Sequence, residues 1–307
     1  MATVYCSECG SKNKSKDIHC TKCNSTLKTD KISYGEKITS FNKLITKENY
    51  QILSDTYFTS TMYQGVLDEI IRIGKNKFTY DENDTALNNI INLADQYVDI
   101  YSKRKGSSAG FYIANQIYFE ERSTDAEKIG TIIHELTHHL FAEIFEQFLM
   151  YALCVEKTKY IEAYVLFTFI PPNLQLLNEY VAHTTEGQFI IHGCQNYGSF
   201  IKIMEENHIK LEEVKELLAL GRAVSNDITM ILEEFIDENL RKRIIQQYTI
   251  NNVPRRFDQI EFEEVEEMPE DFKSEFIGVL LRGPMDACLK DKKIMEILRS
   301  RLDVFNQ

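Results

Sequence analysis

One stretch in the middle of the chain, Thr124 to Phe148, constrains the fold more than any other. Thr124 followed by Glu127 is the pattern of a capping box, which closes the first turn of a helix. Apolar residues then recur at the three- and four-residue spacing of an α-helix. They are Ala126, Ile129, Ile132, Ile133, Leu136, Leu140, Ile144, Phe145 and Phe148. The pattern predicts a helix with apolar flanks, against which other parts of the chain must pack.

Inside this predicted helix, His134, Glu135 and His138 form the pattern H-E-x-x-H. Residues four apart lie one turn apart on the same side of a helix, so both imidazoles can reach a single metal ion. Glu135 lies about 100° further round the helix. Its carboxylate is then beside the metal without being a ligand, where it can take a proton from a zinc-bound water. The pattern predicts a catalytic zinc site; the alternative is a helix whose histidines face solvent or are satisfied in the core.

A second helix is predicted to follow Pro171-Pro172, because a proline suits the first turn of a helix. It contains N-E-Y-V-A-H, residues 178–183. H-E-x-x-H followed some tens of residues later by a helical N-E-x-x-A resembles the gluzincin metallopeptidases. The resemblance covers roughly residues 109–190. In that family two histidines of the first helix and a glutamate of the second bind zinc, which implies His134, His138 and Glu179 as ligands and Glu135 as the general base.

The resemblance also implies a fold and an activity. The fold would be α+β and predominantly helical, a zincin-like metallopeptidase domain with a small sheet. The activity would be hydrolysis of peptide bonds in a protein or peptide substrate, by an endopeptidase rather than an exopeptidase. The cofactors would be one catalytic zinc ion and, from the amino-terminal segment described below, one structural zinc ion.

One position departs from the family pattern. Many gluzincins have an acid four residues after the ligand glutamate, where it orients a zinc-bound imidazole. This chain has His183 at that position. His183 can hydrogen-bond Glu179, or it can itself be the third ligand. A different acid is a further alternative for that ligand: Glu143, Glu146 or Glu186.

Apolar residues alternate just before the predicted zinc helix: Phe111, Ile113, Ile117 and Phe119, on either side of residues 114–116. The alternation predicts a short hairpin or a bent strand. In zinc peptidases with this helix, the preceding strand often edges the cleft and pairs with an extended substrate. The alternative is a strand that only packs under the helix.

The first 31 residues contain two C-x-x-C pairs, which are Cys6 with Cys9 and Cys20 with Cys23. Each pair can present two thiolates to one tetrahedral zinc ion. The segment resembles the short zinc-ribbon modules of many bacterial and archaeal proteins. So few residues cannot bury a useful core, so metal binding would supply the folding energy. We expect a structural zinc ion here, in a module that is purely structural or docks on a protein partner. The alternative is that its six lysines contact nucleic-acid phosphates.

Charge and composition exclude some functions. The net charge is −12, and the first 31 residues, with six lysines against three acids, are the positive part. This balance argues against a general nucleic-acid binder. The longest apolar stretch, Ala163 to Ile170, is too short to span a bilayer, so no membrane partner is expected. The amino terminus lacks the apolar segment of a secretory signal, and paired cysteines suit a reducing compartment, so we expect a cytoplasmic protein.

The expected organisation has three parts. Residues 1–30 form a zinc ribbon with four cysteine ligands, 36–200 a metallopeptidase-like catalytic domain, and 201–307 a helical part packed on that domain. Helices are further expected over about residues 38–73, 85–101, 151–170, 211–220, 228–245 and 272–305.

Two other functions fit the same sequence. One is a regulatory or binding protein that keeps the peptidase fold, with or without zinc, but is catalytically silent. The other is a zinc-ribbon adaptor whose large domain is a helical interaction scaffold and whose H-E-x-x-H is accidental. The adaptor would bind a single zinc ion, held by the four cysteines.

Overall fold

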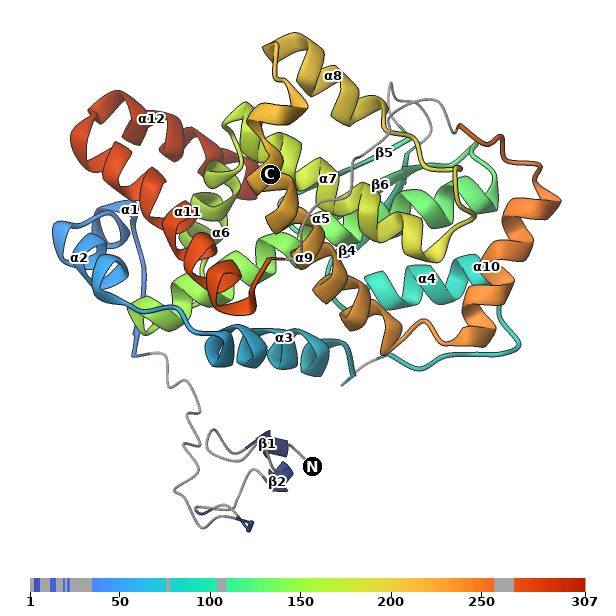
Figure 1. The fold of residues 1–307 in the computed structure, drawn as a ribbon, viewed down its shortest axis with the longest axis horizontal. Coiled ribbons are helices and arrows are strands. Elements are labelled where there is room, and N and C mark those ends of the chain that lie inside the picture. Colours follow the sequence, from blue (N-terminus) through green and yellow to red (C-terminus); the bar gives the residue numbers. More distant parts are fainter. Residues whose placement is uncertain are drawn as a thin grey trace.

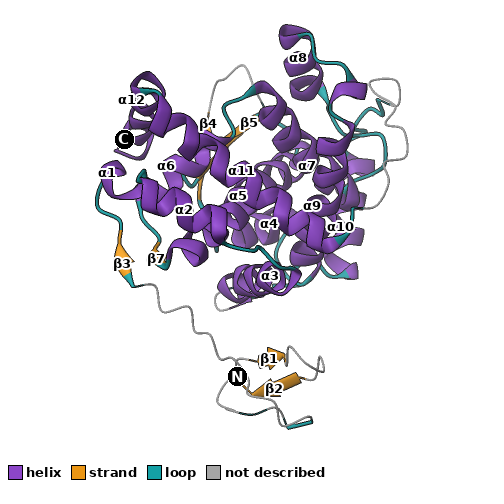
Figure 2. Ribbon diagram, turned by 60° about the vertical axis from the view of Figure 1, so that its left-hand side comes forward, coloured by secondary structure: helices purple, strands orange, loops and turns teal. Residues whose placement is uncertain are grey.

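The protein is described from a computed structural model, which gives residues 3–5, 12–14, 19, 21–22, 35–75, 78–103, 109–256 and 268–306. The described part is predominantly helical with small sheets (Figures 1 and 2), as the sequence predicts. The four cysteines of the expected zinc ribbon lie outside the described residues. Two short strands of that segment, β1 (Thr3–Tyr5) and β2 (Lys12–Lys14), pair antiparallel.

The predicted central helix is α5 (Asp125–Leu153), which lies in the middle of the molecule (Figure 1). Both halves of the capping box are present, since Glu127 N donates to Thr124 Oγ1 at 3.3 Å and Thr124 N donates to Glu127 Oε2 at 2.9 Å. The helix is buried over most of its length. It ends at Leu153, and the next residue, Cys154, adopts a left-handed conformation with φ 56°. The core is assembled round α5, because it contacts α3 (Ser60–Lys75), α4 (Ala86–Ala94), α6 (Lys159–Thr168) and α7 (Pro172–Phe189).

All six further helices expected from the sequence are wrong in extent. The helix expected over residues 38–73 is three helices, and the one expected over 85–101 ends at Ala94. The one expected over 151–170 is interrupted, because α5 continues to Leu153 and the chain is extended at Thr158. The observed helices are α1 (Phe41–Leu44), α2 (Lys47–Asp55), α3 (Ser60–Lys75), α4 (Ala86–Ala94) and α6 (Lys159–Thr168).

The other three lie in the carboxy-terminal part and are each divided between elements. The one expected over residues 211–220 is divided between η1 (Leu211–Glu213) and α9 (Lys215–Glu233), the one over 228–245 between α9 and α10 (Glu238–Ile250), and the one over 272–305 among α11 (Glu270–Lys290), α12 (Lys292–Arg301) and η2 (Leu302–Asn306).

A three-stranded sheet precedes α5 in the chain. It consists of β4 (Asp99–Lys103), β5 (Gly110–Ile113) and β6 (Gln116–Glu120), in the order β4-β6-β5. β6 pairs parallel with β4 and antiparallel with β5, which leaves β5 at one edge. β5 and β6 are joined through Ala114 and Asn115, both with positive φ, as a two-residue hairpin turn requires. Of the two predicted forms, the hairpin is the one observed.

The remaining elements surround α5 and the helix after it. The predicted helix at Pro172 is α7 (Pro172–Phe189), which packs along α5. α9 packs against α7, and α10 contacts α5 and α4. The other elements are β3 (Glu36–Lys37) and β7 (Val155–Glu156), which pair parallel, α8 (Gly198–Asn207), η1 (Leu211–Glu213), α9 (Lys215–Glu233), α10 (Glu238–Ile250), α11 (Glu270–Lys290), α12 (Lys292–Arg301) and η2 (Leu302–Asn306). Among the described residues, none of these helices has the length and apolarity needed to cross a membrane.

Candidate metal centre and its cleft

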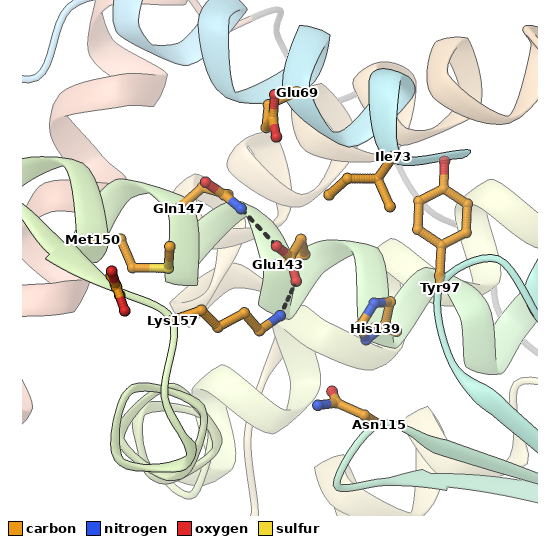
Figure 3. Close-up of a pocket in the computed structure, with 10 residues that line it drawn as sticks. Glu69, Ile73, Tyr97, Asn115, His139, Glu143, Gln147, Met150 and Lys157 are labelled. Atoms are coloured by element: carbon orange, nitrogen blue, oxygen red, sulfur yellow. Dashed lines mark hydrogen bonds and ion pairs between the residues drawn. The ribbon is translucent and has the colours of Figure 1, made fainter. Parts of the chain in front are cut away.

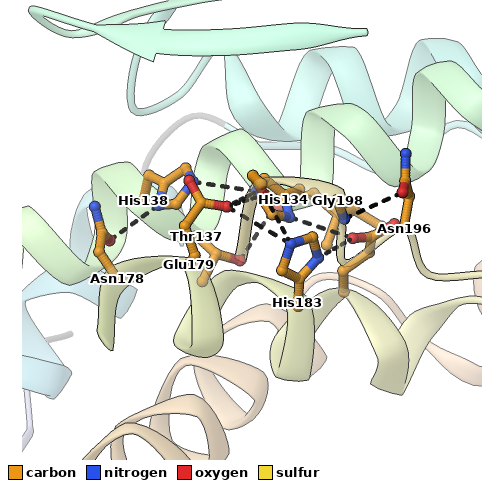
Figure 4. Close-up of polar contacts among 11 residues, drawn as sticks. His134, Thr137, His138, Asn178, Glu179, His183, Asn196 and Gly198 are labelled. Atoms are coloured by element: carbon orange, nitrogen blue, oxygen red, sulfur yellow. Dashed lines mark hydrogen bonds and ion pairs between the residues drawn. The ribbon is translucent and has the colours of Figure 1, made fainter. Parts of the chain in front are cut away.

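The side chains of His134, His138 and Glu179 converge between α5 and α7 (Figure 4). The Nε2 atoms of the two histidines are 3.1 Å apart. His134 Nε2 lies 3.6 Å from Glu179 Oε2, and His138 Nε2 lies 3.7 Å from Glu179 Oε1. Nitrogen and oxygen ligands about 2.0–2.1 Å from a tetrahedral zinc ion lie about 3.3 Å from one another. Both the donor set and the spacing therefore fit zinc.

The outer nitrogens of both imidazoles are held by acceptors. His134 Nδ1 donates to Glu186 Oε2 at 3.2 Å, and His138 Nδ1 donates to Asn178 Oδ1 at 2.9 Å. A proton on Nδ1 leaves the lone pair of Nε2 free to face the centre, and such outer partners orient metal-bound histidines. Burial opposes protonation of His134, but hydrogen bonds to Glu179 and Glu186 outweigh it and raise its pKa well above the ordinary value. The two carboxylates thus favour a cation at this place.

Glu135 lies next to the convergence point, on the side facing β5. Its side chain is buried, and this burial raises the pKa of its carboxyl, although His134 and His138 oppose the rise. β5 can run this close to α5 because Gly110 has no side chain. A Cβ atom on Gly110 would lie 2.2 Å from Thr131 Cγ2 and 3.3 Å from Glu135 Oε1.

His183 lies behind Glu179. Its Nε2 is 3.1 Å from Ser199 Oγ and 3.6 Å from Glu179 Oε2, and Ser199 itself donates to Glu179. The ring of His183 packs against that of His134, with centroids 4.4 Å apart. His183 can therefore steady Glu179, as one of the two predicted roles requires.

The structure also separates the acids that were alternatives for the third ligand. Glu143 and Glu146 form ion pairs with Lys157. Glu186 lies close to His134 and His183. It contacts the outer nitrogen of His134, Nδ1, which donates a hydrogen bond to it, and not the inner nitrogen Nε2 that faces His138. Of the candidates, Glu179 is the one that completes a set with the inner nitrogens of both His134 and His138.

A cleft of about 700 Å³ opens along the metal centre. The edge strand β5 forms one wall, since Gly110, Phe111 and Tyr112 line the cleft. Glu120 N donates to Ala109 O, so in the antiparallel pairing residues 109, 111 and 113 are bonded to β6. Gly110 and Tyr112 then direct their backbone N–H and C=O groups away from β6, towards the side where the cleft lies.

No family model matches this chain, and no curated protein or solved structure matches it either. Sequence reasoning missed three residues of the site: Gly110, Ser199 and, as the partner of His138, Asn178. Asn178 could have been found, because it directly precedes the expected ligand Glu179 on the same helix. Nothing local to Gly110 or Ser199 signals their place, since each depends on how two elements pack together.

Proposed function

We propose that the protein is a zinc-dependent metallopeptidase of the gluzincin type, which hydrolyses peptide bonds in a protein or peptide substrate. The observation that carries the proposal is the convergence of His134 Nε2, His138 Nε2 and the Glu179 carboxylate beside a cleft, with Glu135 next to them. The oriented outer nitrogens support it, because Glu186 and Asn178 fix both imidazoles in the form that binds metal.

A zinc ion held by these three residues would polarise the scissile carbonyl and make a bound water more acidic. Glu135 accepts a proton from the attacking water and passes it to the leaving amine. The raised pKa of Glu135 suits this role, because a carboxylate with an ordinary pKa is a weak base at neutral pH. His183 and Ser199 hold the Glu179 carboxylate in place from behind.

The edge of β5 offers the substrate a place to bind. An extended peptide can add to this edge through the backbone groups of Gly110 and Tyr112, a mode of recognition that depends little on side chains. The cleft follows α5 from Glu127 to Glu146, which is about 28 Å at 1.5 Å per residue. His134 and His138 lie between these ends, so a chain can extend to both sides of the metal. This favours an endopeptidase over an exopeptidase.

A second zinc ion is proposed for Cys6, Cys9, Cys20 and Cys23. This site would be structural, since four thiolates leave no open position. We further propose that the protein acts in the cytoplasm and that the ribbon is structural or docks on a protein partner.

The test begins with zinc per chain in purified protein. The double substitution His134→Ala plus His138→Ala is expected to lower the content from about two ions to one, while His208→Ala, at an exposed histidine, leaves it unchanged. Glu135→Gln should keep both ions and lower kcat on an unstructured protein substrate by about 10²- to 10⁴-fold. Glu205→Gln, at an exposed position on α8, is the matched control. Equal zinc content in the double variant, or full turnover by Glu135→Gln, would refute the proposal.

A further inference from the structure

One end of the cleft forms a pocket that the proposed chemistry does not use. Beyond His138, α5 contributes Ala142 and Glu146 to the cleft wall, and α6 with the residue after it contributes Glu162, Leu166 and Phe169. We call these five residues the acidic pocket. The side chains of Glu146 and Glu162 are only 4% and 15% exposed. Apolar walls with buried carboxylates suit a ligand that has an apolar stem and a cationic head.

The acids at this place outnumber the cations. Lys157 Nζ lies 2.7 Å from Glu146 Oε2 and 4.0 Å from Glu162 Oε1, and it also hydrogen-bonds Glu143 on the far side (Figure 3). One ammonium therefore serves three carboxylates. His139 adds no charge, because burial lowers its pKa to about 4.

Glu146 is the acid with the weakest compensation. Its Oε2 atom is buried and is paired with Lys157, an ammonium that it shares with Glu143 and Glu162. Burial raises the pKa of Glu146 to about 8 against the attraction of Lys157, and the nearby Glu143 adds to the rise. A buried carboxylate in this state would be stabilised by a further cation.

The pocket has a defined position along a bound peptide. β5 runs beside α5 in the same direction. Gly110, at the start of β5, is next to Thr131 and Glu135, whereas the hydroxyl of Tyr112, two residues later, lies 3.2 Å from Nδ1 of His139, further along α5. Directly after β5, Asn115 Nδ2 donates to Glu162 Oε1 at 2.7 Å. The path from Glu135 to the acidic pocket thus follows β5 from its start to its end.

A peptide that adds antiparallel to β5, the more stable form of pairing, runs the opposite way. The part of the peptide at the acidic pocket then precedes the scissile bond. Glu146 is eight residues beyond His138, or about 12 Å along the helix axis. A lysine or arginine side chain placed about one to three residues before the bond can span this distance, at about 3.3 Å per residue of extended chain.

We propose that the acidic pocket binds a positively charged nitrogen of the substrate on the amino-terminal side of the cleaved bond. The nitrogen belongs to a lysine or arginine side chain, or to the free α-ammonium group of a short peptide. The inference rests on the proposed peptidase function and gives it a substrate class.

The test uses two sets of fluorogenic peptides, one with an acetylated and one with a free amino terminus. In each, lysine, arginine or the uncharged norleucine occupies the first, second or third position before the scissile bond. The full-length, zinc-loaded protein is expected to cleave its best lysine or arginine peptide with a kcat/KM about 10- to 100-fold above the norleucine peptide. If the α-ammonium is the group bound, the preference appears instead between free and acetylated peptides.

Glu146→Gln and Glu162→Gln should remove most of this preference, measured within each variant as the ratio of kcat/KM for the charged peptide to kcat/KM for the norleucine peptide. Glu156→Gln is the matched control, because Glu156 is exposed and follows α5 without lining the cleft. Equal cleavage of charged and uncharged peptides in both sets would overturn the inference and leave the peptidase function standing.

Binding separates this inference from the proposed function. Fluorescence anisotropy with the Glu135→Gln protein measures the affinity for the same peptides without turnover. If no peptide is cleaved by the unsubstituted protein, the peptidase proposal fails, yet tighter binding of the charged peptides, lost in Glu146→Gln, would still support a cation pocket. Equal affinity for charged and norleucine peptides would overturn it.

Discussion

Replacing Glu146 with glutamine should change how stability depends on pH. The pKa of Glu146 is raised to about 8 in the folded protein by burial, from an ordinary value of 4.5. Between pH 6 and 9 the unfolded chain carries no proton on this carboxyl, whereas the folded chain starts with one and loses it. The state that holds more protons is stabilised at low pH, so this group lowers the free energy of unfolding as pH rises.

The size of the effect follows from the shift. A pH of 6 is about two units below the pKa of Glu146 in the folded protein, and each unit corresponds to about 1.4 kcal/mol. The free energy of unfolding therefore falls by about 3 kcal/mol between pH 6 and pH 9. The glutamine side chain of the Glu146→Gln variant cannot ionise, so this variant lacks the pH-dependent contribution to the free energy of unfolding. Its neighbours do not confound the comparison: the pKa of Glu143 is lowered, that of Lys157 is raised, and that of His139 is about 4, so all three titrate outside this range.

The assay is urea denaturation of the zinc-loaded protein at pH 6, 7, 8 and 9, followed by circular dichroism. The stability of Glu146→Gln relative to the unsubstituted protein should rise by about 3 kcal/mol across the range, and that of Glu156→Gln should stay constant. A flat difference for Glu146→Gln would mean that this carboxylate is already ionised and compensated at pH 6. The acidic pocket would then have no unmet charge to offer a substrate.

Four further substitutions test the site and its scaffold. Asn178→Ala removes the acceptor of His138 Nδ1 and should weaken zinc binding about 10- to 100-fold in competition with a chelating indicator, while Asn173→Ala, exposed on the same helix, should not. Gly110→Ala should lower the free energy of unfolding by about 1–3 kcal/mol, because its Cβ would lie 2.2 Å from Thr131 Cγ2 and 2.8 Å from Tyr118 O. Gly65→Ala, with nothing within 4 Å in α3, should instead raise it by about 0.5–1 kcal/mol. Thr124→Ala removes the cap of α5 and should cost about 1 kcal/mol in the same denaturation assay.

Patterns among residues that are close together in the sequence gave the reliable predictions of secondary structure. The start of α5 was predictable because a capping box involves residues three apart, and the hairpin because alternation and a turn lie within ten residues of one another. β4 was missed because its partner β6 follows a connection, and pairing across that distance has no local pattern. Residues 99–101 therefore looked like the end of a helix when the apolar spacing of α4 was continued through them.

In the candidate site, too, some residues could be predicted from local sequence patterns and others depend on tertiary packing. His134 and His138 share one helix, so their joint orientation follows from the helical period. Glu179, His183 and Glu186 also share a face, but which of them meets the histidines depends on how α7 is placed against α5. That placement is set by packing between helices. The acidic pocket could not be predicted at all, because its carboxylates and Lys157 come from α5, α6 and the segment between them.

The polar residues of α5 argue for function more strongly than any one distance. Buried polar groups cost free energy unless they are paired, and apolar side chains at the same positions would stabilise the core more simply. Yet α5 turns His134, Glu135, His138, Glu143 and Glu146 inward. Partners from α7 and the segment before α6 pair with most of them. Burial raises the pKa of Glu135 and of Glu146, and both side chains line the cleft. A helix that served only as a scaffold would have no reason to keep them there, whereas a helix that meets a water molecule at one point and a cation at another would need both.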